Sequence, residues 1–239
     1  MACAPREINM EYLERRVPFH RRIDGLSAHF IGVPYVLNPL GEGFGFDPDP
    51  ILRNDAFDCV TFVETVMAKA RSGSIVENKI AISYIDGNLD WASRRHFFEV
   101  DHYAGTMVLV RDMMTHAHVG TIDRCEFLRR QNPDVICDVP PHEFMLPYVP
   151  GYEIGRIRLP RNDAFVVGVV WDNPRLRATI GSDVLISHVG LLIVRDGVAV
   201  VRHASSAAGM VVEESWEEFT MRQMALPHRI GITLWRPVP

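Results

Sequence analysis

The sequence predicts a single α+β domain in which helices come first and strands come later. Helix-like apolar spacing marks the early part of the chain, whereas the last third consists mostly of strand-like runs. This order of elements is typical of an α+β fold. Of the 239 residues, 47% are hydrophobic and 23% are charged, as in an ordinary globular domain. We therefore expect residues 1–239 to form one domain.

The first half of the chain contains two helix signals separated by a loop. Residues 6–30 carry a charged, partly periodic pattern that predicts an N-terminal helical segment, broken near Pro18. Residues 33–50 are rich in proline and glycine and are expected to form a loop. Apolar residues with helical spacing then predict a helix over residues 59–71. Asp58 precedes this helix and is a favoured N-cap, because its carboxylate can accept hydrogen bonds from the first turn.

The remainder of the chain predicts an irregular insertion followed by strands. Residues 131–163 contain six prolines, so we expect a long surface insertion without regular structure. A short helix is expected near residues 215–224. Strand-like apolar runs predict four strands, over residues 164–171, 184–194, 198–205 and 230–236.

Composition and charge exclude several classes of protein. A net charge of −5 lacks the strongly basic character of a nucleic-acid binder. The apolar stretches are far shorter than the roughly 20 residues that a membrane span needs. Four cysteines are too sparse for a disulfide framework. We therefore expect each cysteine to be either a small buried side chain or a nucleophile.

Cys59 is the candidate nucleophile, because it lies at the N-terminal end of the buried face of the predicted helix. A thiol at this place feels the positive end of the helix dipole. We expect the pKa of Cys59 to fall, which would enrich the nucleophilic thiolate. The alternative is a core cysteine that happens to begin a helix.

Two histidines are expected on one face of a β-hairpin. The dipeptide Asp196-Gly197 separates two strand-like runs and favours a two-residue type I′ turn. This turn fixes the register and places His203 opposite Gly190. His188 then lies diagonal to His203 on the same face, within reach of its side chain. The alternative is a pair of unrelated surface or core histidines.

These residues together suggest a cysteine hydrolase. Cys59 would be the nucleophile and His188 the general base, which takes the thiol proton and later protonates the leaving amine. His203 would orient the ring of His188, as the third member of a catalytic triad does. Backbone N–H groups at the start of the helix would form an oxyanion hole.

The chain resembles the NlpC/P60 branch of the papain-like cysteine peptidases, in which a helix cysteine precedes two strand histidines. It is more similar to the bacterial DUF1460 family, described as N-acetylmuramoyl-L-alanine amidase-like. The similarity covers roughly residues 30–236. It is carried by the segments PYVLNPLGEG (34–43), DCVTFVETVMA (58–68), SRRHF (93–97), SHVGLLI (187–193) and RHASS (202–206).

The resemblance implies a papain-like NlpC/P60 core, with the catalytic cysteine at a helix N-terminus packed on an antiparallel β-sheet. It implies a cysteine-dependent amidase or endopeptidase that hydrolyses an amide bond in bacterial peptidoglycan peptides. By the same resemblance, Cys59, His188 and His203 match the family's nucleophile, base and orienting positions. Two departures concern substrate preference: Arg95 stands where the family pattern has Asn, and residues 131–163 have no counterpart in it.

Arg94, Arg95 and His96 are candidate substrate-binding residues. A cationic rim suits the free carboxylates of wall peptides, and arginine binds carboxylates in a bidentate geometry. Tyr35 is a candidate lining residue of the same cleft. The alternatives are a solvated turn for the first three residues and core packing for Tyr35.

Two other functions stay open. His116 and His118 stand two residues apart, so on a strand both could bind the zinc ion of a metal-dependent amidase. Candidates for the remaining zinc ligands are Asp112, Asp123 and His96. The chain could also be a non-catalytic wall-binding module in which Cys59 is inert. The cysteine mechanism needs no metal, and we expect no cofactor.

The expected partner is peptidoglycan or a muropeptide. The first ten residues show no apolar segment typical of a signal peptide, so we expect a protein that is cytoplasmic in the cell that makes it. Three explanations stay open: a removed export signal, recycling of wall fragments, or delivery by a secretion system into a competitor's periplasm. The last is favoured, because an enzyme acting on its own cell's wall normally carries a signal. A cognate immunity protein is then a further expected partner.

Overall fold

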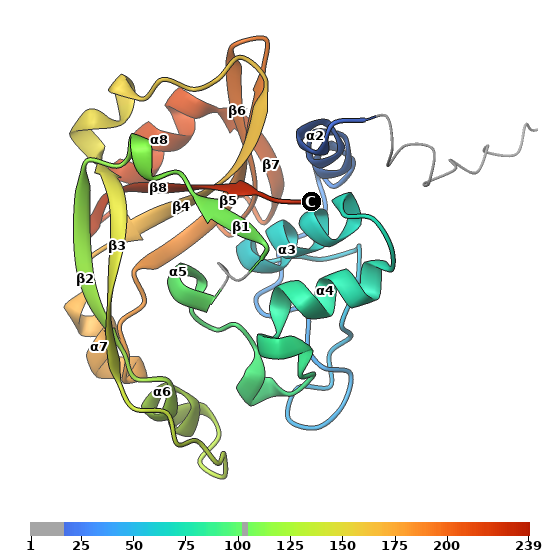
Figure 1. Cartoon of the computed structure of the whole chain (residues 1–239), viewed down its shortest axis with the longest axis vertical. Coiled ribbons are helices and arrows are strands. Elements are labelled where there is room, and N and C mark those ends of the chain that lie inside the picture. The colour runs from blue at the N-terminus through green and yellow to red at the C-terminus, as the bar shows by residue number, and fades with distance from the viewer. Residues whose placement is uncertain (1–16, 102–104) are drawn as a thin grey trace, which may run out of the picture.

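A computed structural model describes residues 17–101 and 105–239 (Figure 1). The helices are α2 (Phe19–His29), α3 (Cys59–Ala70), α4 (Ile75–Ser83), α5 (Phe98–Asp101), α6 (Arg124–Gln131), α7 (Pro174–Ile180) and α8 (Trp216–Met224). The strands are β1 (Met107–Leu109), β2 (His116–Ile122), β3 (His142–Pro150), β4 (Asp163–Trp171), β5 (Ile186–Arg195), β6 (Val198–Ser205), β7 (Met210–Ser215) and β8 (Arg229–Pro237). Short 3-10 helices are η1 (Ile85–Gly87), η2 (Trp91–Ser93), η3 (Arg111–Met113) and η4 (Gly151–Arg156).

The described strands form one antiparallel sheet in the order β2-β3-β8-β4-β5-β6-β7, with β1 paired to β8. Helices α2 and α3 cover one face of the sheet and α8 covers the other (Figure 1). The predicted α+β class is therefore confirmed. Among the described residues, no helix combines the length and apolarity that a bilayer crossing requires.

The central strands are buried on both faces, which explains their nearly continuous apolar sequences. In β4, Val166 joins the core cluster on the α3 side, whereas Phe165 and Val167 join the cluster on the α8 side. In β5, Leu191 and Leu192 divide between the same two clusters. Adjacent side chains of a strand point to opposite faces, so each strand supplies both cores.

Helix α3 begins at Cys59 because Asp58 caps it, as the sequence predicts. The Asp58 carboxylate accepts from the backbone N–H of Thr61 at 2.8 Å. In return, the hydroxyl of Thr61 accepts from the backbone N–H of Asp58 at 3.0 Å. This reciprocal capping box satisfies two backbone donors and fixes the position of the first helical residue. Helix α2 begins after Pro18, and residues 6–16 of the expected helical segment lie outside the described residues.

The β5–β6 hairpin has the predicted register. Asp196 and Gly197 both have positive φ angles, of 51° and 89°, as a type I′ turn requires. Arg195 pairs with Val198, and the pairing continues in register along both strands. The hairpin therefore fixes which side chains of β5 and β6 share a face.

The prediction that residues 131–163 lack regular structure is wrong. Strand β3 lies within this segment, and its residues 142–148 pair with β2. Among the described strands, residues 142–148 pair with β2 alone, and Val149 and Pro150 pair with β8 alone. A proline is tolerated where its nitrogen faces away from a pairing partner. The number of prolines was therefore a poor guide to secondary structure here, because a strand segment with a partner on one side only can accommodate proline.

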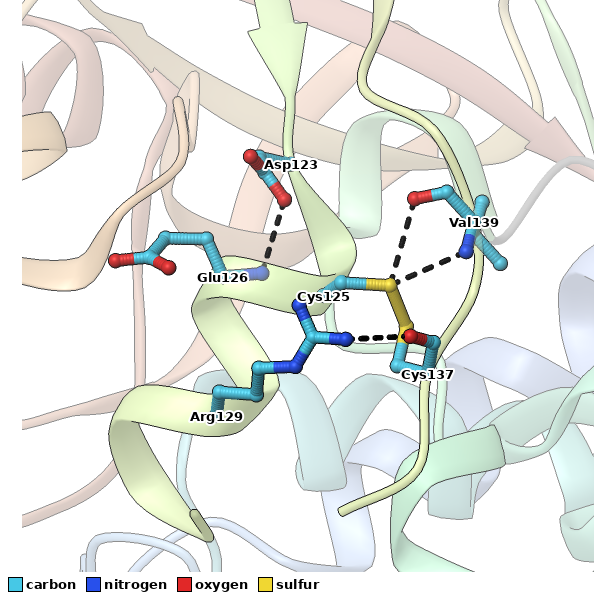
Figure 2. Close-up of a disulfide and its surroundings, with 6 residues drawn as sticks. All are labelled: Asp123, Cys125, Glu126, Arg129, Cys137 and Val139. Carbon is cyan, nitrogen blue, oxygen red and sulfur yellow. Dashed lines mark hydrogen bonds between the residues drawn. A yellow bond between two sulfur atoms is a disulfide. The ribbon is translucent and has the colours of Figure 1, made fainter. Parts of the chain in front are cut away.

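The expectation that every cysteine is a buried side chain or a nucleophile is also wrong. Cys125 on α6 forms a disulfide with Cys137 in the following loop, with a Cα–Cα distance of 5.3 Å (Figure 2). The Cys125 sulfur also contacts the backbone N–H of Val139 at 3.2 Å, and Arg129 donates to the Cys137 carbonyl at 2.6 Å. One disulfide here closes a local loop, which a low total of cysteines does not exclude.

Candidate functional site

Cys59 is the first residue of α3 and lies against the start of β5. Its half-buried side chain packs on the core cluster between α3 and the sheet. The backbone N–H groups of Val189 and Val60 stabilise the thiolate form of Cys59. Val189 directly follows His188, so the contact brings the helix N-terminus to the strand that carries the candidate base. Among the described cysteines, Cys59 alone is free.

The prediction that the pKa of Cys59 falls is wrong. Burial raises the pKa of the Cys59 thiol to about 12, and the neighbouring Asp58 carboxylate adds to the rise. Together these two effects exceed the opposing contribution of the backbone N–H groups. The sequence argument considered the helix dipole but not the desolvation of the thiol, which disfavours its charged form. The raised pKa of Cys59 therefore favours the neutral thiol.

His188 and His203 meet as the hairpin register predicts. His188 Nε2 lies 2.8 Å from His203 Nδ1, and the two rings are nearly perpendicular. Burial holds the pKa of His188 well below its usual value, and the neighbouring His203 lowers it further. Burial therefore keeps His188 in its neutral form, which is the form that can accept a proton.

Sequence reasoning missed two charged residues behind the histidines. Glu214 on β7 accepts a hydrogen bond from His203 Nε2 at 2.6 Å. Arg222 on α8 forms an ion pair with the same carboxylate. In the β6–β7 ladder His203 pairs with Val212, which places Glu214 on the same face two residues along. Residues 211–214 read Val-Val-Glu-Glu and do not alternate between apolar and polar, so no strand was predicted there.

Tyr35 lies close to the helix N-terminus. Its backbone N–H donates to the Gly209 carbonyl at 2.8 Å, and the residue also forms a bridge with Phe57. Burial raises the pKa of the Tyr35 hydroxyl to about 12, with smaller contributions from Cys59 and Asp58. The structure therefore places Tyr35 beside the candidate nucleophile.

Arg94, Arg95 and His96 line a cavity of about 170 Å³ that reaches the first turn of α3. The same cavity is bounded by Asp58 and Val60, on either side of Cys59 in the chain. The predicted binding residues thus share a cavity with the chain neighbours of Cys59, whereas Cys59 itself does not line it.

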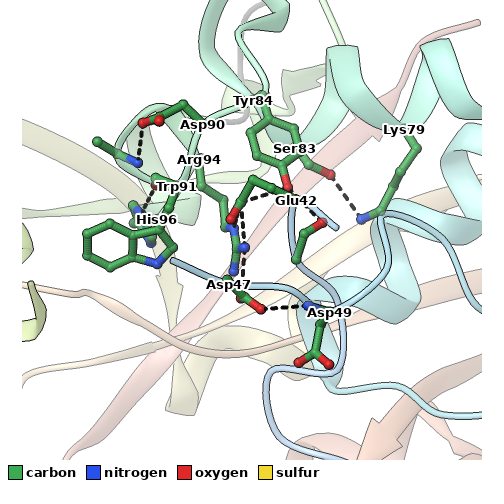
Figure 3. A network of polar contacts seen from close by, with 12 residues as sticks. Glu42, Asp47, Asp49, Lys79, Ser83, Tyr84, Asp90, Trp91, Arg94 and His96 are labelled. Atoms are coloured by element: carbon green, nitrogen blue, oxygen red, sulfur yellow. Dashed lines mark hydrogen bonds and ion pairs between the residues drawn. The ribbon is translucent and has the colours of Figure 1, made fainter. Parts of the chain in front are cut away.

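The cationic character of these residues is largely balanced inside the protein. Arg94 donates to Glu42 at 3.1 Å and to Asp47 at 2.9 Å (Figure 3). His96 Nε2 lies 2.8 Å from the Trp91 carbonyl oxygen, and burial lowers the pKa of His96 to about 4. Arg95 donates to the Asp101 carbonyl. The expected cationic rim is therefore a cavity wall with an ion-paired Arg94, an Arg95 bonded to a backbone carbonyl and a neutral His96.

The alternative zinc pair lies elsewhere, on β2. His116 Nε2 is 3.2 Å from the hydroxyl of Tyr152, and His118 is 3.9 Å from Asp172. In the part of the chain that the structure describes, no group of three or more His, Cys, Asp or Glu side chains could hold a metal ion. His116 and His118 thus have no third protein ligand among these residues.

The sequence matches the family described as AmiA-like, N-acetylmuramoyl-L-alanine amidase-like, over residues 25–226. The fold is similar to that of a Legionella pneumophila protein of the DUF1460 family, with a TM-score of 0.83 and 23% identity over 96% of this chain and 92% of that one. It is also similar to an N-acetylmuramoyl-L-alanine amidase from Bacteroides uniformis, with a TM-score of 0.68 and 19% identity over 92% and 99%. Among curated proteins, none matches this sequence.

Proposed function

Because this chain belongs to the N-acetylmuramoyl-L-alanine amidase-like family, we propose that it is a cysteine-dependent amidase of bacterial peptidoglycan. The bond we propose is the amide between the lactyl group of N-acetylmuramic acid and L-alanine, which is the bond that the name of the Bacteroides uniformis neighbour describes. The observation that carries the cysteine mechanism is the 2.8 Å contact of His188 with His203, beside a cysteine held at the start of β5.

In the proposed reaction, Cys59 Sγ attacks the amide carbonyl carbon while its proton passes to His188. Because His188 Nε2 contacts His203, the proton goes to the other ring nitrogen, Nδ1. The C–N bond then breaks, the proton moves from His188 to the leaving amine, and a thioester remains on Cys59. Water attacks the thioester, His188 takes a proton from that water, and the thiol is regenerated.

The neutral resting state gives the helix N-terminus a specific role. Thiolate character develops only as His188 removes the proton, and the Val189 and Val60 N–H groups then stabilise the charge. Such interactions act in the transition state more than in the ground state, and this difference lowers the barrier.

We further propose that the core is papain-like and belongs to the NlpC/P60 group. The support is the order of the parts: a cysteine that begins α3, then His188 on β5, then His203 on β6 of an antiparallel sheet. The disulfide between Cys125 and Cys137 supports action outside the cytoplasm, because such bonds persist in oxidising compartments. Delivery into a competitor and a cognate immunity protein stay predictions of the sequence.

The function is tested by mass spectrometry of purified muropeptides incubated with the protein. We expect release of the intact stem peptide with a free L-alanine amino group, and no release by Cys59→Ala or His188→Ala. His116→Ala is the matched control, because it removes an exposed histidine of the zinc alternative on β2. Activity that survives Cys59→Ala but is lost in His116→Ala would move the assignment to a metal amidase.

A further inference from the structure

The arrangement behind the two histidines decides which of their nitrogens carry protons. A carboxylate can only accept hydrogen bonds, so Glu214, 2.6 Å from His203 Nε2, requires a proton on that nitrogen. In a neutral ring the other nitrogen, Nδ1, is then an acceptor. His188 Nε2 lies 2.8 Å from this acceptor and must be the donor. His188 Nδ1 is thereby left without a proton, as a base requires.

Arg222 opposes this arrangement. Its Nη2 lies 3.3 Å from His203 Nε2, and a guanidinium can only donate. With Glu214 present, Arg222 pairs with the carboxylate, through Nη2 to Oε1 and through Nε to Oε2 at 3.3 Å. Without Glu214, the same guanidinium would face the ring and favour an unprotonated Nε2.

We propose that Glu214 is a positioning residue that sets the tautomers of both His203 and His188 and keeps Arg222 from reversing them. Glu214 touches neither the nucleophile nor the substrate site and acts only through His203. This inference deepens the proposed function and rests on it for the activity measurement alone. The tautomers themselves can be measured whatever reaction the protein catalyses.

The decisive variant is Glu214→Ala. Arg222 can then donate to His203 Nε2, so the proton of His203 moves to Nδ1 and is donated to His188 Nε2. His188 consequently carries its proton on Nδ1 and cannot accept one from Cys59. Both rings are expected to change tautomer, and kcat should fall about 10²- to 10⁴-fold, as when the orienting carboxylate of a triad is neutralised.

Two companion variants separate this mechanism from simple loss of structure. Glu214→Gln keeps an oxygen that can accept from His203, so it should retain both tautomers in part and lose less activity than Glu214→Ala. The double variant Glu214→Ala with Arg222→Ala removes the competing donor as well as the acceptor, so it should no longer favour the reversed tautomers and should recover part of the activity. A purely structural role predicts that the double variant is worse than the single one.

The matched control is Glu213→Gln on the same strand. Glu213 also pairs with an arginine, the buried Arg202, but it lies on the opposite face from Glu214. This variant should lower the melting temperature without changing either tautomer.

The measurement is long-range 1H–15N NMR on protein labelled at histidine, assigned with His188→Ala and His203→Ala, alongside kcat and KM on muropeptides. In the unmodified protein, both His188 and His203 should show a proton on Nε2. A proton on His203 Nδ1 in that spectrum would overturn the proposal even if Glu214→Ala failed to fold. Unchanged tautomers in a folded Glu214→Ala variant would also overturn it. If the tautomers respond as expected but no muropeptide is cleaved, the proposed function fails and this inference stands.

Discussion

Gly190 allows β5 and β6 to approach closely enough for the two histidines to meet. A Cβ atom added at Gly190 would lie 3.0 Å from His203 Cβ, 3.1 Å from Val201 Cγ1 and 3.2 Å from the Arg202 carbonyl oxygen. Two of these atoms belong to short, stiff parts of their side chains and one to the backbone, so β6 itself must move. Overpacking of this kind costs about 2 kcal/mol of unfolding free energy. For a domain of this size the melting temperature should fall by about 4–8 °C.

The same displacement should reach the site. The contact nearest to the added atom is His203, whose Nδ1 lies 2.8 Å from His188 Nε2. Contacts of 3.0–3.2 Å require a shift of a few tenths of an ångström, and because a misplacement of about 1 Å can cost about 10²-fold in rate, the loss here should be smaller. We therefore expect Gly190→Ala to lower both stability, measured by calorimetry, and kcat on muropeptides. Gly155→Ala is the control, because an added Cβ there meets no atom within 4 Å. A Gly190→Ala protein that melts and turns over like the control would refute the packing argument.

Three further predictions concern stability and reactivity. Burial raises the pKa of Glu99 from 4.5 to about 7, so the folded state binds a proton that the unfolded state releases earlier. The stability that this proton contributes is greatest below pH 4.5 and is lost as the pH rises through about 7. The loss amounts to about 3 kcal/mol of unfolding free energy. Glu99→Gln should remove this pH dependence, which urea titration at a series of pH values measures. Reducing the disulfide, or replacing both cysteines by Cys125→Ser with Cys137→Ser, should lower the unfolding free energy by about 3 kcal/mol, because the bridge spans 12 positions. Calorimetry measures this loss, and muropeptide cleavage should continue. Unchanged stability would contradict the disulfide. Iodoacetamide should alkylate Cys59 slowly below about pH 9, because its pKa is raised to about 12; rapid alkylation at pH 6 would instead indicate a stable thiolate.

Local signals predicted the elements that carry the candidate triad. An N-cap and a two-residue turn depend on residues adjacent in sequence, and so the start of α3 at Cys59 and the β5–β6 register were both predicted. Strand β3 was not, because its tolerance of prolines depends on having few partners, which only the assembled sheet defines. The pairing of Cys125 with Cys137 likewise depends on how the loop after α6 folds back.

The electrostatics of the site could not be predicted from sequence neighbours. The helix dipole is a local effect, whereas the desolvation of Cys59 depends on the strand and loop packed around it. The ion pairs of Arg94 with Glu42 and Asp47 join residues about 50 positions apart, so the sequence showed an unpaired charge where the structure has a balanced one. Glu214 contacts His203 through a strand pairing that was not predicted.

The central claim is that Cys59 forms a covalent bond to its substrate. Rapid-quench mass spectrometry of the protein mixed with a muropeptide tests it most directly. The peptide that contains Cys59 should gain the mass of the muramoyl acyl group as a thioester, and hydroxylamine should remove this adduct. Cys59→Ser should form no thioester adduct. Full turnover of the same muropeptide by Cys59→Ala, with no adduct on the native protein at any quench time, would contradict the account.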